Sequence, residues 1–323
     1  MKAARVHECG GPEAFVIENV PDPIPGAGEV LVRVEVAGVN FIDVYQRRGE
    51  YGVKLPVTLG QEAAGIVIGL GPEVGGFHPG DRVGWCNVLG AYAEQAVVPA
   101  SALVCVPAGI GPREAAAAML QGMTAHYLAT TIYPLSSGDT CLVHAAAGGV
   151  GLLLCQIAKS RGARVIGTAG TDEKAGLARS AGADHVIVYT RENFEAEAMR
   201  LTGGAGVQVV FDSVGRSTFD GSLQCLAPRG MMVLFGQSSG PVPPFDPQRL
   251  NQRGSLFLTR PSLKHYTATR GELLARSSEV LEWIREGALK IRIGGDYPLS
   301  RIADAHRDLE SRSTTGKLLV FPD

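Results

Sequence analysis

Several features of secreted, disulfide-bonded and nucleic-acid-binding proteins are missing from this chain of 323 residues. Its six cysteines are scattered without a C-x-x-C motif, which suggests reduced, mostly buried thiols in a cytoplasmic protein. The 30 basic and 32 acidic side chains nearly cancel, so no electrostatic signature for nucleic acid or an anionic membrane is present. Residues 1–10 lack the apolar run of a signal peptide.

No apolar run has the character of a membrane-spanning helix. The most hydrophobic stretch, Thr140–Ala158, contains His144, Gln156 and closely spaced glycines. A spanning helix would be more uniformly apolar, so this stretch is better interpreted as a buried strand followed by a helix.

The residue pattern changes along the chain, and the length favours two domains. Residues 1 to about 120 contain short β-prone runs separated by Gly and Pro, which is typical of a strand-rich, barrel-like domain: Glu29–Val36, Ala63–Ile68, Asp81–Cys86 and Ala91–Val98. From about 122 to 260, strands and helices alternate. The expected strands are Thr140–Ala145, Arg164–Thr168, His185–Val188, Gln208–Asp212, Met231–Phe235 and Ser255–Leu258.

Six strands with helical crossovers predict a doubly wound parallel sheet. Helices are expected between the strands, for example over Arg191–Leu201 and Ser217–Leu226. The chain then predicts a helix over Arg270–Glu286 and a β-prone tail at Lys317–Phe321.

The turn after the first of these six strands is the most informative motif. Ala146-x-Gly148-x-x-Gly151 follows a strand and opens the amphipathic stretch Gly149–Lys159. Small residues at this spacing let a pyrophosphate approach the backbone, while the N–H groups and dipole of the helix attract its charge. Glycines also gather in ordinary tight turns, but the strand–turn–helix context favours a dinucleotide site.

The tip of the second strand indicates which dinucleotide binds. An NAD-selective site usually places Asp or Glu there, but Ala169-Gly170-Thr171 follows this strand. Asp172 and Glu173 are expected in the first turn of the next helix, with Thr171 as its N-cap. Lys174 and Tyr189 lie within reach of a 2′-phosphate, although Lys174 could also be a solvated helix residue. The predicted cofactor is NADPH.

Motifs along the whole chain resemble the zinc-free quinone oxidoreductases, the relatives of zeta-crystallin in the medium-chain dehydrogenase/reductase superfamily. These motifs are Ala37–Asp43, Leu59–Gly65, Gly80–Val83, His144–Gly151, Asp212–Gly215, Phe235–Ser238 and Thr259–Leu263. The resemblance implies an α/β protein with a GroES-like β-barrel catalytic domain, residues 1–121 completed by 265–323. It also implies a Rossmann domain with a doubly wound parallel sheet, residues 122–264, that binds NADP(H).

The resemblance also implies site residues. Asn40, Asp43 and Tyr45 would line the nicotinamide end and the substrate site, and they are the predicted catalytic residues. The implied cofactor contacts are Asn40, Tyr45, Tyr127, Ala147, Gly148, Gly149, Val150, Gly170, Lys174, Tyr189, Ser213, Phe235, Gly236, Gln237, Ser238, Leu258, Thr259, Arg260 and Arg312.

Structural alternatives remain for some of these residues. Asn40 and Asp43 could be turn residues, Tyr45 and Phe235 core aromatics, and Arg312 part of a solvated loop. Two further polar residues are expected to be structural: His144 as a hydrogen-bonded histidine at a strand end, and Glu62 as a hydrogen-bonding group inside the barrel. No residue stands out as an essential acid or base; solvent or Tyr45 could protonate the product.

Zinc ligands are absent from the positions where the superfamily's alcohol dehydrogenases have them. Cys, His and Cys are replaced by Asn40, Gln61 and the region of Leu120-Gln121. We therefore expect no metal. A quinone or conjugated enone is already electrophilic and does not need one, so the expected reaction is direct hydride transfer from NADPH to a quinone.

Other functions stay open at this point. A reductase of α,β-unsaturated ketones, aldehydes or thioesters would use the same hydride donor. A non-enzymatic protein, either crystallin-like with bound cofactor or RNA-binding, is less favoured because no basic–aromatic stripe is present. The last strand of the parallel sheet would leave an open edge, so we expect a homodimer joined through it. The alternative is that the chain's own loop 239–251, which is long enough and contains proline, covers this edge.

Overall fold

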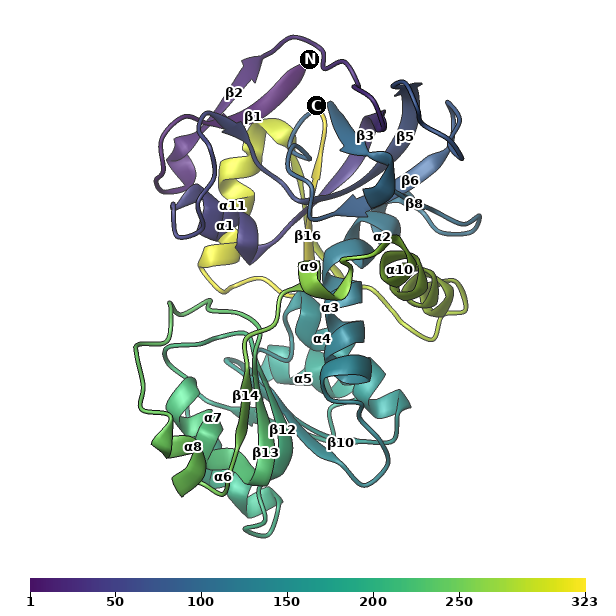
Figure 1. The fold of residues 1–323 in the computed structure, drawn as a ribbon. Coiled ribbons are helices and arrows are strands. Elements are labelled where there is room, and N and C mark those ends of the chain that lie inside the picture. The colour runs from purple at the N-terminus through teal and green to yellow at the C-terminus, as the bar shows by residue number, and fades with distance from the viewer. The chain divides into compact units, whose positions relative to one another are not determined.

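The computed structural model describes all residues, 1–323, and the chain divides into two compact units (Figure 1). Unit 1 comprises residues 1–123 and 267–323, and unit 2 comprises residues 124–266. The domain boundaries expected from the sequence, 121/122 and 264/265, lie close to these divisions. No helix combines the length and the hydrophobicity needed to cross a membrane.

Unit 2 contains a six-stranded sheet in the order β11-β10-β9-β12-β13-β14, with every neighbouring pair parallel. Its strands are β9 Thr140–Val143, β10 Arg164–Ala169, β11 His185–Val188, β12 Val207–Asp212, β13 Leu226–Leu234 and β14 Phe257–Thr259. Its helices are α3 Met123–Tyr127, α4 Gly149–Ser160, α5 Asp172–Ser180, α6 Phe194–Leu201, α7 Phe219–Cys225, α8 Gln248–Gln252 and α9 Leu263–Tyr266. Strand order reverses between β9 and β12. The doubly wound parallel sheet predicted from the sequence is confirmed.

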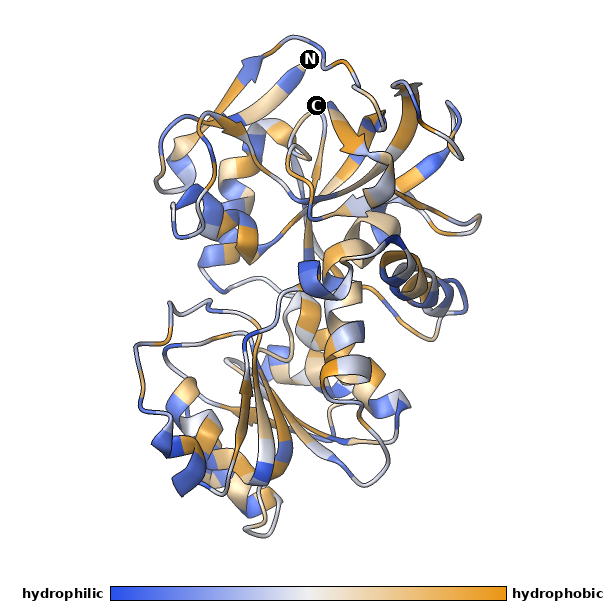
Figure 2. Cartoon of the chain, viewed as in Figure 1, coloured by the Kyte–Doolittle hydropathy of each residue, from blue (hydrophilic) through white to orange (hydrophobic).

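The strands of unit 2 are hydrophobic along most of their length because helices cover the sheet on both faces (Figures 1 and 2). Helices α4 and α5 pack together, and α6 packs with α7. Leu142, Ile166 and Val210, from three neighbouring strands, belong to one buried cluster. This packing fixes the carboxyl ends of the strands, from which the loops of a ligand site emerge.

Unit 1 contains a seven-stranded sheet in the order β15-β16-β3-β5-β6-β8, with β7 also paired to β3, and a small sheet β2-β1-β4. Its strands are β1 Lys2–Val6, β2 Phe15–Asn19, β3 Glu29–Val39, β4 Val57–Thr58, β5 Glu62–Leu70, β6 Arg82–Cys86, β7 Gln95–Pro99, β8 Val104–Cys105, β15 Ile293–Pro298 and β16 Lys317–Phe321. Its helices are α1 Phe41–Arg47, α2 Pro112–Ala117, α10 Arg270–Arg285 and α11 Ile302–Glu310.

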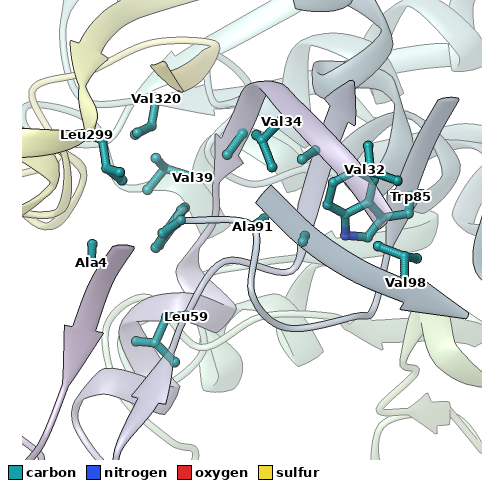
Figure 3. Close-up of a cluster of buried hydrophobic side chains, with 14 of the residues drawn as sticks. Ala4, Val32, Val34, Val39, Leu59, Trp85, Ala91, Val98, Leu299 and Val320 are labelled. Atoms are coloured by element: carbon teal, nitrogen blue, oxygen red, sulfur yellow. The ribbon is translucent and has the colours of Figure 1, made fainter. Parts of the chain in front are cut away.

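The core of unit 1 joins both ends of the chain (Figure 3). Val32, Val34 and Val39 of β3 are buried with Trp85 of β6 and Val320 of β16. Figure 3 shows these side chains around the strands that carry them. The antiparallel pairing of β16 with β3 places the C-terminal residues beside Ala37–Val39, where the chain enters α1.

Two helices of unit 2 begin later than predicted. Helix α6 starts at Phe194 instead of Arg191 because the Asn193 side chain accepts a hydrogen bond from the Ala196 N–H at 2.9 Å, which caps the helix. Helix α7 starts at Phe219 instead of Ser217. The last strand also differs: β14 starts at Phe257, because Ser255 has a positive φ of 58° that is incompatible with a strand.

Candidate active site

The carboxyl ends of β9 and β12 form the switch point of the parallel sheet, where ligands of such folds bind. After β9 the chain turns sharply: Ala145 has a positive φ of 49°, and the Gly148 N–H donates to the Ala145 carbonyl at 2.9 Å. Gly148 then caps α4, whose first N–H groups have no partner within the helix. Gly149 and Val150, the first residues of α4, thus present backbone N–H groups at a helix N-terminus, as an anion requires, and Ala147 and Gly148 form the turn that leads to them.

Gly151 allows this turn to pack against the first turn of α4. A Cβ atom at residue 151 would lie 2.3 Å from the Ala145 carbonyl oxygen, so even alanine would push the turn away. The last glycine of the Ala146-x-Gly148-x-x-Gly151 motif therefore has a steric role, while the atoms facing an anion come from the residues before it.

A buried polar network lies beneath the switch point. His144 hydrogen-bonds Thr168 through Nδ1 and Ser222 through Nε2, both at 3.0 Å. Ser222 donates its hydroxyl proton to Asp212 at 3.0 Å, so it must accept from His144 Nε2–H. Burial lowers the pKa of His144, which is therefore neutral and acts as a link between strand ends. The prediction of a hydrogen-bonded strand-end histidine is confirmed.

Asp212 extends this network into the loop after β12. One carboxylate oxygen accepts from the Val214 and Gly215 N–H groups at 2.7 and 3.0 Å. The other accepts from Thr218 and Ser222. Three of these hydrogen bonds, from Val214, Gly215 and Thr218, hold the loop that carries Ser213, and the fourth joins Asp212 to Ser222 of α7.

The tip of β10 lies against the tip of β11. The Tyr189 N–H donates to the Ala169 carbonyl at 3.1 Å, and a Cβ atom at Gly170 would lie 2.8 Å from the Tyr189 hydroxyl oxygen. Thr171 caps α5 by accepting from the Lys174 N–H at 3.2 Å, as predicted from the sequence. Burial lowers the pKa of the Lys174 ammonium, and the neighbouring Glu173 opposes that shift. Gly170, Lys174 and Tyr189 are thus gathered at adjacent strand tips.

The remaining predicted cofactor residues of unit 2 follow the next strands. Phe235 and Gly236 come directly after β13, and their N–H groups donate to the Asp212 carbonyl. Leu258 and Thr259 lie in β14, and Arg260 follows it. In the same loop as Gln237, the Ser238 N–H donates to the Ser213 carbonyl at 3.1 Å. Tyr127 is buried in α3 and stacks on Tyr266 with ring centroids 4.5 Å apart, so its ring is also a packing element.

Unit 1 holds a second polar centre around Asn40, the N-cap of α1. Its amide nitrogen donates to Glu62 at 2.7 Å, and its amide oxygen accepts from Lys317 at 2.9 Å and from Gln121 at 3.2 Å. Lys317 also forms an ion pair with Glu62, and both side chains are buried. The second oxygen of Glu62 accepts from the Leu120 N–H at 2.7 Å. The hydrogen bonds fix the orientation of the Asn40 amide, and Glu62 is a buried hydrogen-bonding residue as predicted.

Asp43 lies one turn into α1 and has no exposed surface. Its Oδ2 accepts from the Asn40 N–H at 2.9 Å and from the Tyr92 hydroxyl at 2.8 Å, while its Oδ1 makes no hydrogen bond. Burial raises the pKa of Asp43 to about 7, against the hydrogen bonds from Tyr92 and Asn40, which lower it. The Asp43 carboxyl group is thus enclosed by the protein and hydrogen-bonds the backbone at the start of α1.

The other two predicted residues of unit 1 differ in their surroundings. Tyr45 is 7% exposed and packs against Tyr51, with ring centroids 5.3 Å apart. Arg312 is exposed and follows α11, with a positive φ of 60°. The sequence interpretation missed two residues of the polar centre, Tyr92 and Lys317. The one local signal that could have indicated a buried charge is that Lys317 begins the apolar run Lys317–Phe321.

Comparison with known proteins places the chain in a family. Residues 26–108 match the alcohol dehydrogenase GroES-like domain, and residues 149–285 match the zinc-binding dehydrogenase family. The chain is 45% identical over 315 residues to a quinone oxidoreductase of Pseudomonas aeruginosa, covering 97% of each protein. It belongs to the quinone oxidoreductase branch of the medium-chain dehydrogenase/reductase superfamily.

Two further relatives define what this branch includes. The crystal structure of Escherichia coli quinone oxidoreductase complexed with NADPH superposes with a TM-score of 0.98 at 43% identity, and 100% of each chain is covered. A 2-haloacrylate reductase of Burkholderia is 40% identical over 328 residues, covering 99% of this chain and 98% of that protein. This chain is thus also similar, over almost its whole length, to an enzyme named for a different substrate, a 2-haloacrylate.

Proposed function

We propose that this protein is an NADPH-dependent quinone reductase that works without a metal ion. The observation that carries the proposal is the dinucleotide-binding turn at the switch point, combined with strand tips that present a lysine and a tyrosine in place of the usual acid. The likeness to quinone oxidoreductases over the full chain supports the choice of acceptor.

The residues of unit 2 suit NADPH. Residues 145–149 of the turn are all alanine or glycine, so a pyrophosphate can approach the N–H groups that begin α4. At the tip of β10, Gly170 has no side chain to block the approach, and Lys174 and Tyr189 can hold a 2′-phosphate. When bound, NADPH supplies a hydride. We propose Ser213, Phe235–Ser238, Leu258–Arg260 and Arg312 as further contacts.

The residues of unit 1 do not suit zinc. At two of the three ligand positions of zinc alcohol dehydrogenases the chain has the amides Asn40 and Gln61, not a thiolate and an imidazole. The ammonium of Lys317 lies 2.9 Å from the Asn40 amide oxygen, where a cation would compete with it. No group of three His, Cys, Asp or Glu side chains gathers as a metal site anywhere in the structure. We therefore derive the reaction without a Lewis acid.

Reduction of a quinone to a hydroquinone takes one hydride and one proton. The protein's proposed part is to orient the reactants and exclude water, because the acceptor is already electrophilic. Asn40, whose amide is fixed by Glu62 and Lys317, and Tyr45 are proposed to line the nicotinamide and substrate site; Asp43 is proposed to position Asn40. No buried acid is assigned to deliver the proton, which solvent can supply.

The test is a panel of acceptors with the purified full-length protein. NADPH oxidation is measured with a benzoquinone, a naphthoquinone, an enone and a 2-haloacrylate. We expect turnover with the quinones, faster with NADPH than with NADH. Failure to oxidise NADPH with every quinone, by protein shown to bind NADPH, would refute the proposed acceptor.

A second acceptor class is favoured by one observation, the 40% identity to a 2-haloacrylate reductase over almost the whole chain. Hydride addition to the carbon–carbon double bond of an α,β-unsaturated carbonyl compound uses the same donor. In the panel, a kcat/KM for the enone or haloacrylate above that for the quinones would select this function instead.

We further propose that the protein is a cytoplasmic homodimer joined along β14. This strand ends the parallel sheet, and Phe257 on it is 58% exposed. Residues of the 239–251 loop pack on the core without hiding Phe257: Val242, Phe245 and Leu250. Pairing of two β14 edges would satisfy their backbone groups through a two-fold contact. Six cysteines without a disulfide support a reducing compartment.

A further inference from the structure

The tips of β10 and β11 are joined by an ion pair that the proposed function does not explain. Arg191 forms two parallel hydrogen bonds with Asp172, with Nη1–Oδ2 and Nη2–Oδ1 distances of 2.6 and 2.5 Å. Such a fork-to-fork arrangement is the most directional geometry available to these two groups. Asp172 is the first residue of α5, and Arg191 comes three residues after β11 ends.

Neighbouring contacts hold the arginine beside the aspartate. The Tyr189 N–H donates to the Ala169 carbonyl at 3.1 Å, and the Thr190 hydroxyl donates to the Gly170 carbonyl at 3.1 Å. Three successive residues, 189 to 191, are therefore linked to the tip of β10, and the ion pair is the outermost of these links. The same short stretch of backbone carries the residues proposed to hold the 2′-phosphate.

Asp172 is the first acid after β10 and would disfavour a phosphate if its charge were uncompensated. Hydrogen bonding from Arg191 lowers the pKa of Asp172, so the carboxylate is charged at neutral pH. Two other acids lie nearby: Glu173 interacts with Lys174, and Glu192 accepts a hydrogen bond from the Val188 N–H at 2.7 Å and also interacts with Arg191. Arg191 is the residue that hydrogen-bonds Asp172.

We propose that Arg191 is a specificity-determining residue that favours NADPH over NADH by neutralising Asp172; this inference rests on the proposed use of NADPH. The ion pair removes the negative charge that would repel a 2′-phosphate. The 2′-hydroxyl of NADH carries no charge, so the pair matters little to it. Arg191 acts through Asp172 and does not need to contact the nucleotide.

A double-mutant cycle on nucleotide binding tests this mechanism. Dissociation constants for NADPH and NADH are measured by calorimetry for the wild type, Arg191→Ala, Asp172→Asn and the double variant. One uncompensated charge about 9 Å from a doubly charged phosphate in water corresponds to roughly fivefold in affinity. We expect Arg191→Ala to weaken the binding of NADPH about fivefold and to leave the binding of NADH almost unchanged. The double variant should return to nearly wild-type affinity, because residue 172 then carries no uncompensated charge.

Arg200→Ala is the matched control. This variant breaks a comparable exposed ion pair, Arg200–Glu197, near the end of α6. The next residue, Leu201, accepts a hydrogen bond through its carbonyl from the side chain of Arg164, at the start of β10. The charges that act on Asp172 are those of Arg191 and Arg179, not those of this pair, so neither nucleotide affinity should change. The effect of Arg191→Ala should also shrink as salt is added, since the charges are exposed.

The possible outcomes separate the alternatives. A double variant as weak as Arg191→Ala would show that Arg191 contacts the nucleotide directly, which overturns the mechanism. An unchanged NADPH affinity in Arg191→Ala, with the wild type still preferring NADPH, overturns this inference alone. A wild-type protein without any preference for NADPH overturns the proposed cofactor as well.

Discussion

Replacing Asp43 with asparagine should abolish a specific pH dependence of stability in unit 1. Burial raises the pKa of Asp43 from its ordinary value of 3.8 to about 7 in the folded protein. Between these values the carboxyl is ionised in the unfolded chain but protonated in the folded one. The stability that the protonated Asp43 carboxyl group contributes is therefore fully present below pH 3.8 and is lost as the pH rises through 7.

The magnitude follows from these two pKa values. Integrating the proton difference from pH 5 to pH 8 gives a loss of about 2.5 kcal/mol in the free energy of unfolding. The amide introduced by Asp43→Asn would be neutral at every pH and would keep an oxygen for the Asn40 N–H and the Tyr92 hydroxyl. The free energy of unfolding of Asp43→Asn minus that of the wild type should thus rise by about 2.5 kcal/mol over this range.

Both tryptophans, Trp85 and Trp283, lie in unit 1, so their fluorescence during urea unfolding reports on the unit that contains Asp43. Asp308 accepts a hydrogen bond from the Tyr297 hydroxyl at 2.7 Å in a less buried place. Asp308→Asn therefore controls for loss of a tyrosine–carboxylate hydrogen bond. Parallel pH curves for the wild type and Asp43→Asn would refute the reasoning.

Other variants test the polar centre of unit 1, the proposed phosphate contact and the proposed dimer edge. Lys317→Met should lower the free energy of unfolding by about 3–5 kcal/mol, because Glu62 would be left buried without its cation. Adding Glu62→Gln should recover most of that loss in urea unfolding; no recovery would contradict the pairing. Lys174→Ala should weaken the binding of NADPH by about 1.5–3 kcal/mol, roughly 10- to 100-fold, and leave the binding of NADH unchanged. Equal losses for both nucleotides would be inconsistent with a phosphate contact. Light scattering should show that Phe257→Pro is a monomer while the wild type is the proposed dimer, and a surviving dimer would place the interface elsewhere.

The parallel sheet could be predicted because its determinants are local in sequence. Each of its strands is a short apolar run bounded by turn residues, and the helix between β10 and β11 has its cap, Thr171, directly before it. Strand β15 gave no such signal: Gly294, Gly295 and Pro298 are poor strand formers, and its pairing with β16 makes it a strand.

The polar centre of unit 1 was only partly predictable for a related reason. Asn40 and Glu62 stand in motifs of the family, whereas Lys317 reaches Glu62 across 255 residues of sequence. No local pattern encodes such a contact; the antiparallel pairing of β16 with β3 creates it. Likewise, no local pattern encodes the hydrogen bond that the Tyr92 hydroxyl donates to Asp43 across 49 residues of sequence.

The central claim is that the protein reduces a quinone with NADPH and needs no metal. The most direct measurement is the rate of NADPH oxidation with a benzoquinone as acceptor, using protein dialysed against a chelator and shown by elemental analysis to contain no zinc. We predict the same rate and melting temperature as before dialysis, and no increase when zinc is added. Loss of activity on dialysis that zinc restores would contradict the account.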